Sequence, residues 1–301
     1  MGLGLTTAFA RRAPVTAYAC IGPGALSAVE AAFRSPALRR AASPREASVL
    51  LVAGEPPNED AEGFDRVHDQ IPKPRAVYRW DGRGDPAPTL AALREGLLKG
   101  EPGDPDRLPD TPPNPWRGLG DHGQGGEGMM GGTPYGRPMA MTDADIRDGL
   151  NLDAYACRVG PFASMLPPGL TLDLVLQGDV IVSAEIASPP YEQPAEADAP
   201  GACAARLLRL MGLDHAADRV ASGESALAPF ATRALPPGLA RSPDGDDARR
   251  RLARWLRGSP AGSVAPDPAA MLPGLEWCEA VLALNSFAPS RLRSSALEAT
   301  S

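Results

Sequence analysis

Features that are scarce in this chain narrow the functions open to it. Only four of its 301 residues are cysteines, and they form no CxxC pair and no close pair with histidine. The cysteines are Cys20, Cys157, Cys203 and Cys278. This spacing offers no zinc or iron–sulfur motif, so we expect four partly buried free thiols in a reducing compartment.

Long apolar runs and an excess of basic residues are also missing. No run reaches the roughly 18 consecutive apolar residues that span a bilayer, so any membrane contact would be peripheral. Arg11 and Arg12 interrupt the apolar run where a signal peptide needs its hydrophobic region. The formal net charge of -7 argues against a general nucleic-acid binder. The Ala-, Arg-, Gly- and Pro-rich composition is typical of a bacterial protein.

Several catalytic motifs have no counterpart in the sequence. There is no GxxxxGK[ST] phosphate loop and no GxSxG nucleophile motif. The three histidines lie in separate segments, at His68, His122 and His215. The chain therefore lacks the parts of a catalytic triad or a metalloprotease, and His68 is interpreted as a histidine at the boundary of the core.

Proline and glycine are abundant, with 34 and 32 residues, and they dominate residues 101–141. That segment has no hydrophobic period and is interpreted as a linker or a partner-dependent loop. Residues 123–128 fit GxGxxG, but no strand precedes them, which argues against a dinucleotide site. The neighbouring Asp121, His122 and Glu127 are interpreted as polar residues of a surface loop, because glycines supply no rigid metal site.

The first hundred residues carry the pattern of a parallel α/β unit. Residues 24–33 and 59–71 have helical spacing of apolar residues, and 49–54 is an apolar run closed by glycine. Residues 76–80 form the next predicted strand, which gives a right-handed βαβ unit. A further helix is predicted to be capped by Thr89 and to end at Gly100.

Alternation and helical spacing follow in the second half. Residues 170–176 and 180–186 alternate apolar and polar side chains around Gly178-Asp179, which predicts a β-hairpin. Helices are predicted at 204–212 and 214–223.

A third helix in this half is expected to begin near Asp246, with Leu252, Trp255 and Leu256 facing inward. Its arginines are Arg249, Arg250, Arg251, Arg254 and Arg257. The simplest interpretation of this cluster is a solvated helix face, and the alternative is a surface for an acidic partner.

Residues 43–82 resemble the 20 kDa (B-type) subunit of respiratory complex I and the small subunit of NiFe hydrogenases. Ser43–Ser48 (SPREAS) stands where that family has an SPRxAD-like turn before a strand. Asp69–Arg75 (DQIPKPR) stands where it has DQMPxPK between a helix and the next strand. The order and spacing of both segments agree with the family.

The resemblance also implies the loss of the family's iron–sulfur cluster. Glu30 matches the glutamate that follows the family's Cys-Cys pair, and counting back puts Leu26-Ser27 at the pair itself. The later cysteine would fall near residues 81–84, where none occurs, and the final Cys-Pro motif is missing. A [4Fe-4S] cluster needs thiolate ligands, and Cys20 alone cannot hold it.

Residues 149–186 resemble the N-terminal β-region of the 49 kDa (D-type) complex I subunit and of hydrogenase large subunits. In that family a GPxHPxxHG loop with a quinone-facing histidine precedes a hairpin. Gly160-Pro161 and Gly169 remain here, but Phe162–Ser164 follow instead of the histidine. The resemblance therefore implies that the quinone ligand is also lost.

Together these patterns predict an α/β protein: a short parallel-sheet, flavodoxin-like N-terminal module, then a β-hairpin region and a small helical C-terminal part, with long Pro/Gly loops. The expected divisions are a B-subunit-like module (1–100), a Pro/Gly-rich linker (101–145), a D-subunit-like β region (146–190), and a helical remnant with a tail (191–301).

The resemblance implies a redox-inactive peripheral subunit of a complex I-like or membrane-hydrogenase-like assembly. It would lie at the cytoplasmic face of the inner membrane as a scaffold or cap on proton-translocating membrane subunits, with no catalytic residue, cofactor or metal of its own. The expected partner contacts are Tyr135, Arg137, Met139, Arg250 and Arg254.

Two rival hypotheses stay open at this point. In the first, the chain is an active component of an NADH:quinone oxidoreductase-like complex, and folding brings its four cysteines together around a [4Fe-4S] cluster. In the second, it is a soluble adaptor unrelated to respiration. The first rival predicts bound iron, and the second predicts no membrane partner.

Overall fold

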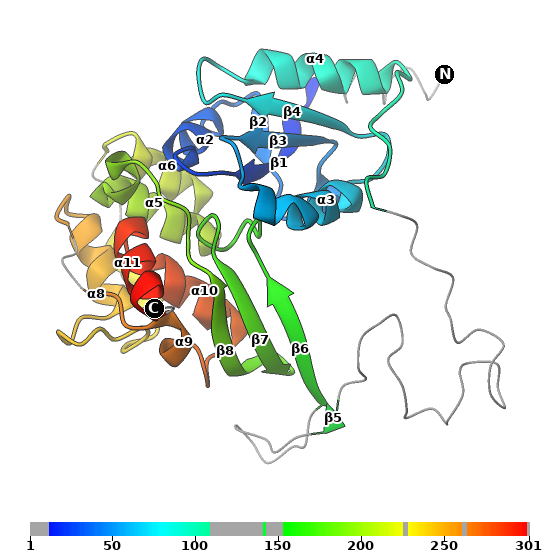
Figure 1. The fold of residues 1–301 in the computed structure, drawn as a ribbon. Coiled ribbons are helices and arrows are strands. Elements are labelled where there is room, and N and C mark those ends of the chain that lie inside the picture. The colour runs from blue at the N-terminus through cyan, green and yellow to red at the C-terminus, as the bar shows by residue number, and fades with distance from the viewer. Residues whose placement is uncertain (1–11, 109–140, 143–152, 225–227, 261–263, 300–301) are drawn as a thin grey trace, which may run out of the picture.

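The computed structural model describes residues 12–108, 141–142, 153–224, 228–260 and 264–299. These residues form two sheets with helices around them (Figure 1). The N-terminal sheet is parallel and has the strand order β2-β1-β3-β4, and the second sheet is antiparallel with the order β5-β6-β7-β8. The α/β class with a parallel N-terminal sheet is therefore confirmed.

The parallel sheet is built around one fully apolar strand. Its strands are β1 (Val15–Ile21), β2 (Leu38–Arg40), β3 (Val49–Ala53) and β4 (Ala76–Trp80). Every side chain of β3 is buried, as expected for a central parallel strand that is covered on both faces. The helices of this module are α2 (Leu26–Ala32), α3 (Ala61–Gln70) and α4 (Ala87–Leu98), with 3-10 turns η1 (Pro44–Glu46) and η2 (Asn58–Asp60).

The two faces of the parallel sheet bury different side chains. Tyr18, Cys20, Leu50 and Val52 point to the face that α3 covers, where Phe64 packs on them. The alternate residues of β1 and β3 pack against α2 and α4 on the other face. The module thus has three layers, with α4 and α3 on opposite sides of the strands in Figure 1.

Three details of this module differ from the sequence prediction. Strands β1 and β2 were not predicted, because the apolar residues of β1 are mixed with small ones and β2 has only three residues. Thr89 is not a cap: α4 already begins at Ala87, whose N–H donates to the Asp85 carboxylate at 2.9 Å. His68 is fully buried rather than at the core boundary, and its Nδ1 lies 2.7 Å from Asp69.

The start of the predicted linker folds back onto this module. Asp69 accepts hydrogen bonds from the N–H groups of Arg107 (3.1 Å) and Leu108 (2.8 Å). The buried Arg75 pairs with Asp69 and with Asp106. Residues 104–108 are therefore held by the DQIPKPR segment, and we call this arrangement the Asp69 clamp.

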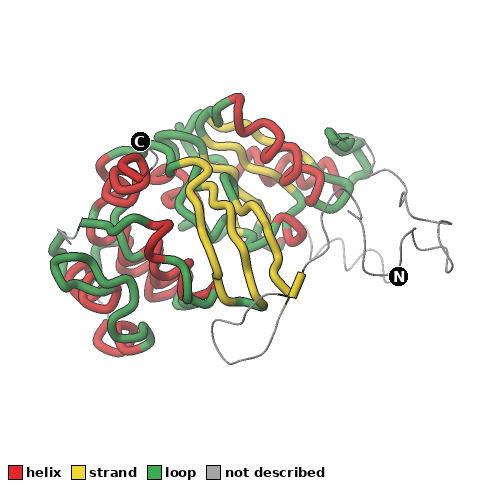
Figure 2. Tube along the Cα trace, turned by 60° about the horizontal axis from the view of Figure 1, so that its bottom comes forward, coloured by secondary structure: helices red, strands yellow, loops and turns green. Residues whose placement is uncertain are grey.

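The second sheet contains the predicted hairpin. Its strands are β5 (Met141–Thr142), β6 (Asp153–Val159), β7 (Thr171–Gln177) and β8 (Val180–Ser188). Gln177 pairs with Val180 across the Gly178-Asp179 turn, so the hairpin and its turn are confirmed. The strands of this sheet run side by side in Figure 2.

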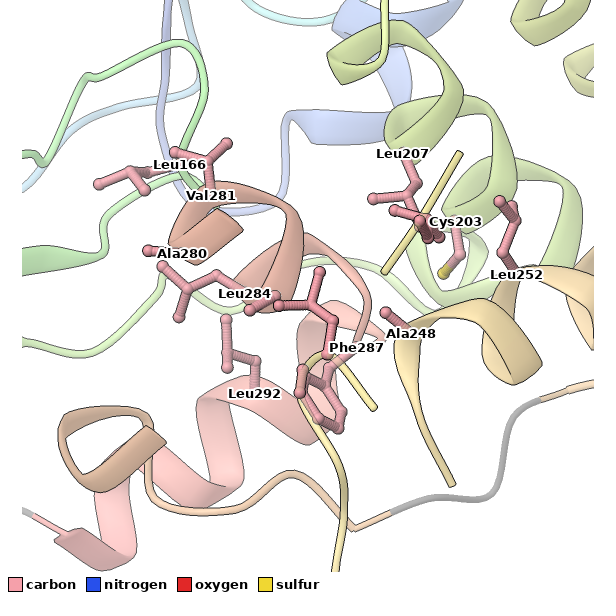
Figure 3. Close-up of a cluster of buried hydrophobic side chains, with 14 of the residues drawn as sticks. Leu166, Cys203, Leu207, Ala248, Leu252, Ala280, Val281, Leu284, Phe287 and Leu292 are labelled. Carbon is pink, nitrogen blue, oxygen red and sulfur yellow. The ribbon is translucent and has the colours of Figure 1, made fainter. Parts of the chain in front are cut away.

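The C-terminal helices cover one face of the second sheet. They are η4 (Ala195–Asp198), α5 (Pro200–Leu210), α6 (Asp214–Ala221), α7 (Ala228–Arg233), α8 (Ala248–Trp255), α9 (Pro268–Met271), α10 (Trp277–Asn285) and α11 (Pro289–Ala299). Leu172, Leu174 and Ile181 of the sheet belong to their apolar core. Figure 3 shows this core between α5, α8 and α10. Part of the predicted tail is therefore packed structure, since α10 and α11 contribute Leu284 and Leu292.

The arginine cluster on α8 is not uniformly solvated, which corrects the simplest interpretation of the sequence. Arg251 is fully buried, donates to the Ser286 carbonyl at 2.8 Å, and lies over the Phe287 ring. Arg249 bonds the Leu235 carbonyl at 2.6 Å. The expected inward position of Leu252 and Trp255 is confirmed.

None of the helices in the described part of the chain is both long enough and apolar enough to cross a bilayer.

Candidate functional site at the junction of the two sheets

The strand order of the parallel sheet singles out one place where ligands bind in open α/β sheets. The helices that follow β1 and β3 lie on opposite faces, so a crevice is expected at the carboxyl ends of these two neighbouring strands. Gly22 follows β1 and Gly54 follows β3. Gly54 has φ +74°, and a Cβ there would lie 2.9 Å from the Pro23 carbonyl, so the two loops meet closely.

Residues from the second half of the chain fill this crevice. The Gly24 N–H donates to the Glu192 carbonyl at 2.9 Å. The Gln193 side chain accepts from the Leu26 N–H at 3.1 Å and donates to the Gly22 carbonyl at 3.3 Å. The segment after β8 therefore satisfies backbone groups at the carboxyl end of β1 that a ligand would otherwise meet.

The loop between β6 and β7 inserts an aromatic ring beside this crevice. Phe162 is only 4% exposed and packs edge-to-face on Phe64, with 6.3 Å between ring centroids. The Phe162 carbonyl accepts a hydrogen bond from the Tyr18 hydroxyl at 2.6 Å. The Tyr18 hydroxyl oxygen in turn accepts one from the Ser164 N–H at 3.2 Å. Burial, helped by Cys20, raises the pKa of Tyr18 to about 12, so its hydroxyl stays a neutral donor.

A charged pair closes the other side of the junction. Arg206 of α5 bonds both oxygens of Glu30 in α2, at 3.2 and 3.3 Å. The side chains of Arg206 and Glu30 are 13% and 11% exposed. Burial disfavours the Arg206 charge, but Glu30 outweighs it and raises the pKa of Arg206. Both charges of this pair also act on Arg40. Burial lowers the pKa of Arg40 to about 10, although the negative charge of Glu30 opposes this shift.

An open pocket of about 360 Å³ lies beside this pair, between α2, α5 and α6. Its floor is made of small residues such as Gly201, Ala202 and Ala205. Its charged rim is balanced, because Glu30 and Glu196 face Arg34 and Arg209. This balance gives the pocket no preference for a cation or an anion.

The residues at the positions that the resemblance assigns to cluster ligands do not fit a [4Fe-4S] cluster. Leu26 is a buried apolar side chain, and Ser27 offers only a hydroxyl. At residues 81–84 the Asp81 carboxylate accepts from the Arg83 N–H, and the Trp80 indole donates to the Arg83 carbonyl at 2.8 Å. A closed turn thus stands where the family's later cysteine would be.

The cysteines lie in separate elements, on β1, β6, α5 and α10. All four are described, and no group of three or more potential metal ligands occurs among the described residues. Burial raises the pKa of the Cys20 thiol, and it raises that of Cys203 to about 11. Neutral buried thiols are poor nucleophiles and poor ligands, so the arrangement does not support a cluster shared by the four cysteines.

The residues singled out in the sequence are only partly placed. Tyr135, Arg137 and Met139 lie outside the described residues, as does the glycine-rich motif. Arg250 and Arg254 lie on α8, where Arg254 pairs with Asp246 at 3.0 Å. They are not part of the junction.

Sequence reasoning missed several residues of the junction. Tyr18, Gln193 and Arg206 belong to no motif, whereas Glu30, Leu26 and Phe162 were named through the resemblance. Their roles depend on contacts between residues 144 to 176 positions apart, which no local pattern reports.

No known protein family, curated protein or solved structure matches the sequence of this chain.

Proposed function

We propose that the chain is a redox-inactive peripheral subunit of a complex I-like or membrane-hydrogenase-like assembly. It serves as a scaffold or cap at the cytoplasmic face of the inner membrane. Its partners are membrane-embedded subunits that translocate protons or other ions. It works by burying surface against these partners rather than by chemistry of its own.

The observation that carries the proposal is the filled crevice at the carboxyl ends of β1 and β3. In the families that the chain resembles, electron transfer needs a cluster next to a quinone-facing loop. Here Leu26 stands at the cluster position, and Phe162 stands in the loop with its ring in the apolar core. Ala163, which follows Phe162, stands at the motif's first histidine position and packs against the C-terminal core. Leu26 and Ala163 thus put apolar side chains at two ligand positions, which favours a structural role over electron transfer.

Contacts made by residues of the resemblance support the same proposal. Glu30, at the position of the family's glutamate, pairs with Arg206 in the second half of the chain. In the DQIPKPR segment, Arg75 is buried. A chain that keeps packing residues but lacks redox ligands is expected to function through its interface with partners.

The test is affinity purification of the tagged full-length chain from gently solubilised native membranes, with mass spectrometry and an iron assay on the same sample. We expect antiporter-like membrane subunits in the sample and no stoichiometric iron in this chain. The tag expressed alone is the control for non-specific recovery.

Two results would contradict the proposal. Recovery of the chain alone from the soluble fraction would favour the adaptor hypothesis. About four irons per chain would favour an active cluster, the iron content expected of [4Fe-4S]. In that case, loss of the iron in a Cys20→Ser variant would assign it to this polypeptide.

A further inference from the structure

The region around α8 is basic although the whole protein is acidic. Residues 233–257 contain seven arginines and three aspartates, a formal net charge of +4, whereas the chain carries -7. Such a local reversal of charge creates a field that attracts an acidic surface.

Three arginines follow one another along α8 and the turn after it. Arg250 and the partly exposed Arg254 lie four residues apart on one side of α8, and the exposed Arg257 lies in the turn after the helix ends at Trp255. Leu252 and Trp255 occupy the buried side. The helix thus separates an apolar inner face from a cationic outer face.

The neighbouring carboxylates neutralise one of these three arginines, Arg254. Asp247 is buried and caps α8 by accepting from the Arg250 N–H at 2.9 Å. Asp246 is also buried and pairs with Arg254, and only Asp244 of the three aspartates is exposed. Within the described part of the chain, no hydrogen bond or ion pair engages the exposed side chain of Arg257.

Apolar surface adjoins these charges. An open pocket of about 380 Å³ lies beside the exposed Arg241, and its walls include Leu239, Pro266 and Met271. Val264, near Pro266 in the chain, is 60% exposed. Cationic side chains beside exposed apolar groups are typical of surfaces that lie on a bilayer.

A second apolar group belongs to the neighbouring helix. Phe230 on α7 is 55% exposed, and α7 packs directly on α8. An exposed phenylalanine on a helix that packs on the arginine-rich α8 gains free energy at the boundary of headgroups and acyl chains.

We propose that the outer face of α8, together with the pocket beside Arg241, docks on a membrane surface that contains anionic phospholipids. Guanidinium groups bind phosphate through paired N–H donors, and the apolar pocket and Phe230 meet the acyl boundary. The inference rests on the proposed function for its setting, because a peripheral subunit needs a surface turned to the membrane. An acidic protein partner is the alternative occupant of this surface, and the experiment distinguishes it from a bilayer.

The experiment is co-sedimentation of the purified full-length chain with vesicles of phosphatidylcholine, either alone or mixed with phosphatidylglycerol. We expect binding to the mixed vesicles only, and weaker binding at high salt because ions screen the attraction. Arg250→Glu combined with Arg257→Glu should weaken binding at least about 25-fold, from about 1 kcal/mol for each arginine. Circular dichroism checks that this double variant is folded.

The matched control is Arg39→Glu combined with Arg83→Glu, which makes the same change of charge at exposed positions of the parallel-sheet module. Its vesicle binding should equal that of the unaltered chain. Failure to bind mixed vesicles, or equal loss in both double variants, would overturn the inference. Binding to polyglutamate without binding to vesicles would also overturn it, in favour of an acidic protein.

The vesicle assay contains no partner subunit, so it separates this inference from the proposed function. If membrane subunits are recovered but vesicles are not bound, the membrane-docking inference is wrong and the proposed function stands. If vesicles are bound but no membrane subunit is recovered, the proposed function is wrong and the docking inference stands.

Discussion

At the residue scale, Phe162 shows how one side chain joins the two halves of the molecule. It comes from the loop between β6 and β7, yet its ring lies in the apolar cluster of the parallel sheet. Its carbonyl is bonded by Tyr18, so backbone and side chain are fixed together. The side chain therefore stabilises the junction as well as the fold.

We expect Phe162→Ala to lower the free energy of unfolding by about 3 to 5 kcal/mol, the usual cost of removing a buried phenylalanine ring. Urea unfolding followed by circular dichroism measures the change. The matched control is Phe230→Ala, because Phe230 is 55% exposed and its loss should cost no more than about 0.5 kcal/mol. Equal costs for the two variants would show that Phe162 does not stabilise the junction.

At the element scale, the Asp69 clamp decides where the chain leaves the parallel-sheet module. Burial opposes the charge of Asp69, but the N–H of Leu108, His68, the N–H of Arg107 and the Arg75 guanidinium outweigh it. The pKa of Asp69 is therefore lowered. The ionised form is the one that holds residues 107 and 108.

This lowered pKa fixes the sign of a pH effect. The stabilisation from Asp69 is fully present above the unfolded aspartate pKa of about 4, and it is lost as the pH falls through the lower folded value. We expect amide hydrogen exchange at Arg107 and Leu108 to be faster in Asp69→Asn than in the unaltered chain near neutral pH. The difference should shrink in acid, where both chains carry an uncharged group.

The control for the clamp is Asp173→Asn, which removes an exposed carboxylate that pairs with Arg158 on the second sheet. It should leave the exchange at residues 107 and 108 unchanged. A difference between Asp69→Asn and the unaltered chain that did not depend on pH would argue against a charge-based clamp.

At the scale of the whole molecule, the parallel-sheet module and the part of the chain from β6 onward pack against each other. We call this mutual packing of the two halves their interlocking. The second half supplies Phe162 and Gln193 to the module that begins the chain, and Glu30 reaches back to Arg206. These contacts are apolar, backbone-directed and ionic. The junction therefore does not depend on the covalent connection between the halves.

We expect residues 1–125 and 126–301, expressed together as two polypeptides, to purify as one complex through a tag on either. Tyr18→Phe combined with Gln193→Ala should weaken the complex at least about tenfold, because partners of buried hydrogen bonds are left unsatisfied. Arg257→Ala, far from the junction contacts, is the control and should have no effect. Fragments that separate without any substitution would disprove the interlocking.

The junction could be predicted only in part from the sequence. Its loop was identified through Gly160-Pro161, and Glu30 through the glutamate that it matches, because the resemblance covers both segments. The destination of Phe162 and the partners of Gln193 could not be predicted, because they depend on which surfaces remain open after each half has folded. The same reason explains Arg251, which lies in a stretch typical of a solvated face but is buried by α10 and Phe287.

The sequence by itself determined the elements whose information is local. The apolar run of β3 requires burial on both faces, and the alternation around Gly178-Asp179 specifies the β7–β8 hairpin. The register shifts within that hairpin, at Thr171/Leu172 and Val175/Leu176, appear only in the structure. The tertiary structure alone decided that the crevice at β1 and β3 is filled by the chain's own Glu192 and Gln193 and flanked by Phe162. Hydrogen bonds such as Tyr18 to Phe162 join residues 144 positions apart, and packing rather than periodicity selects such partners.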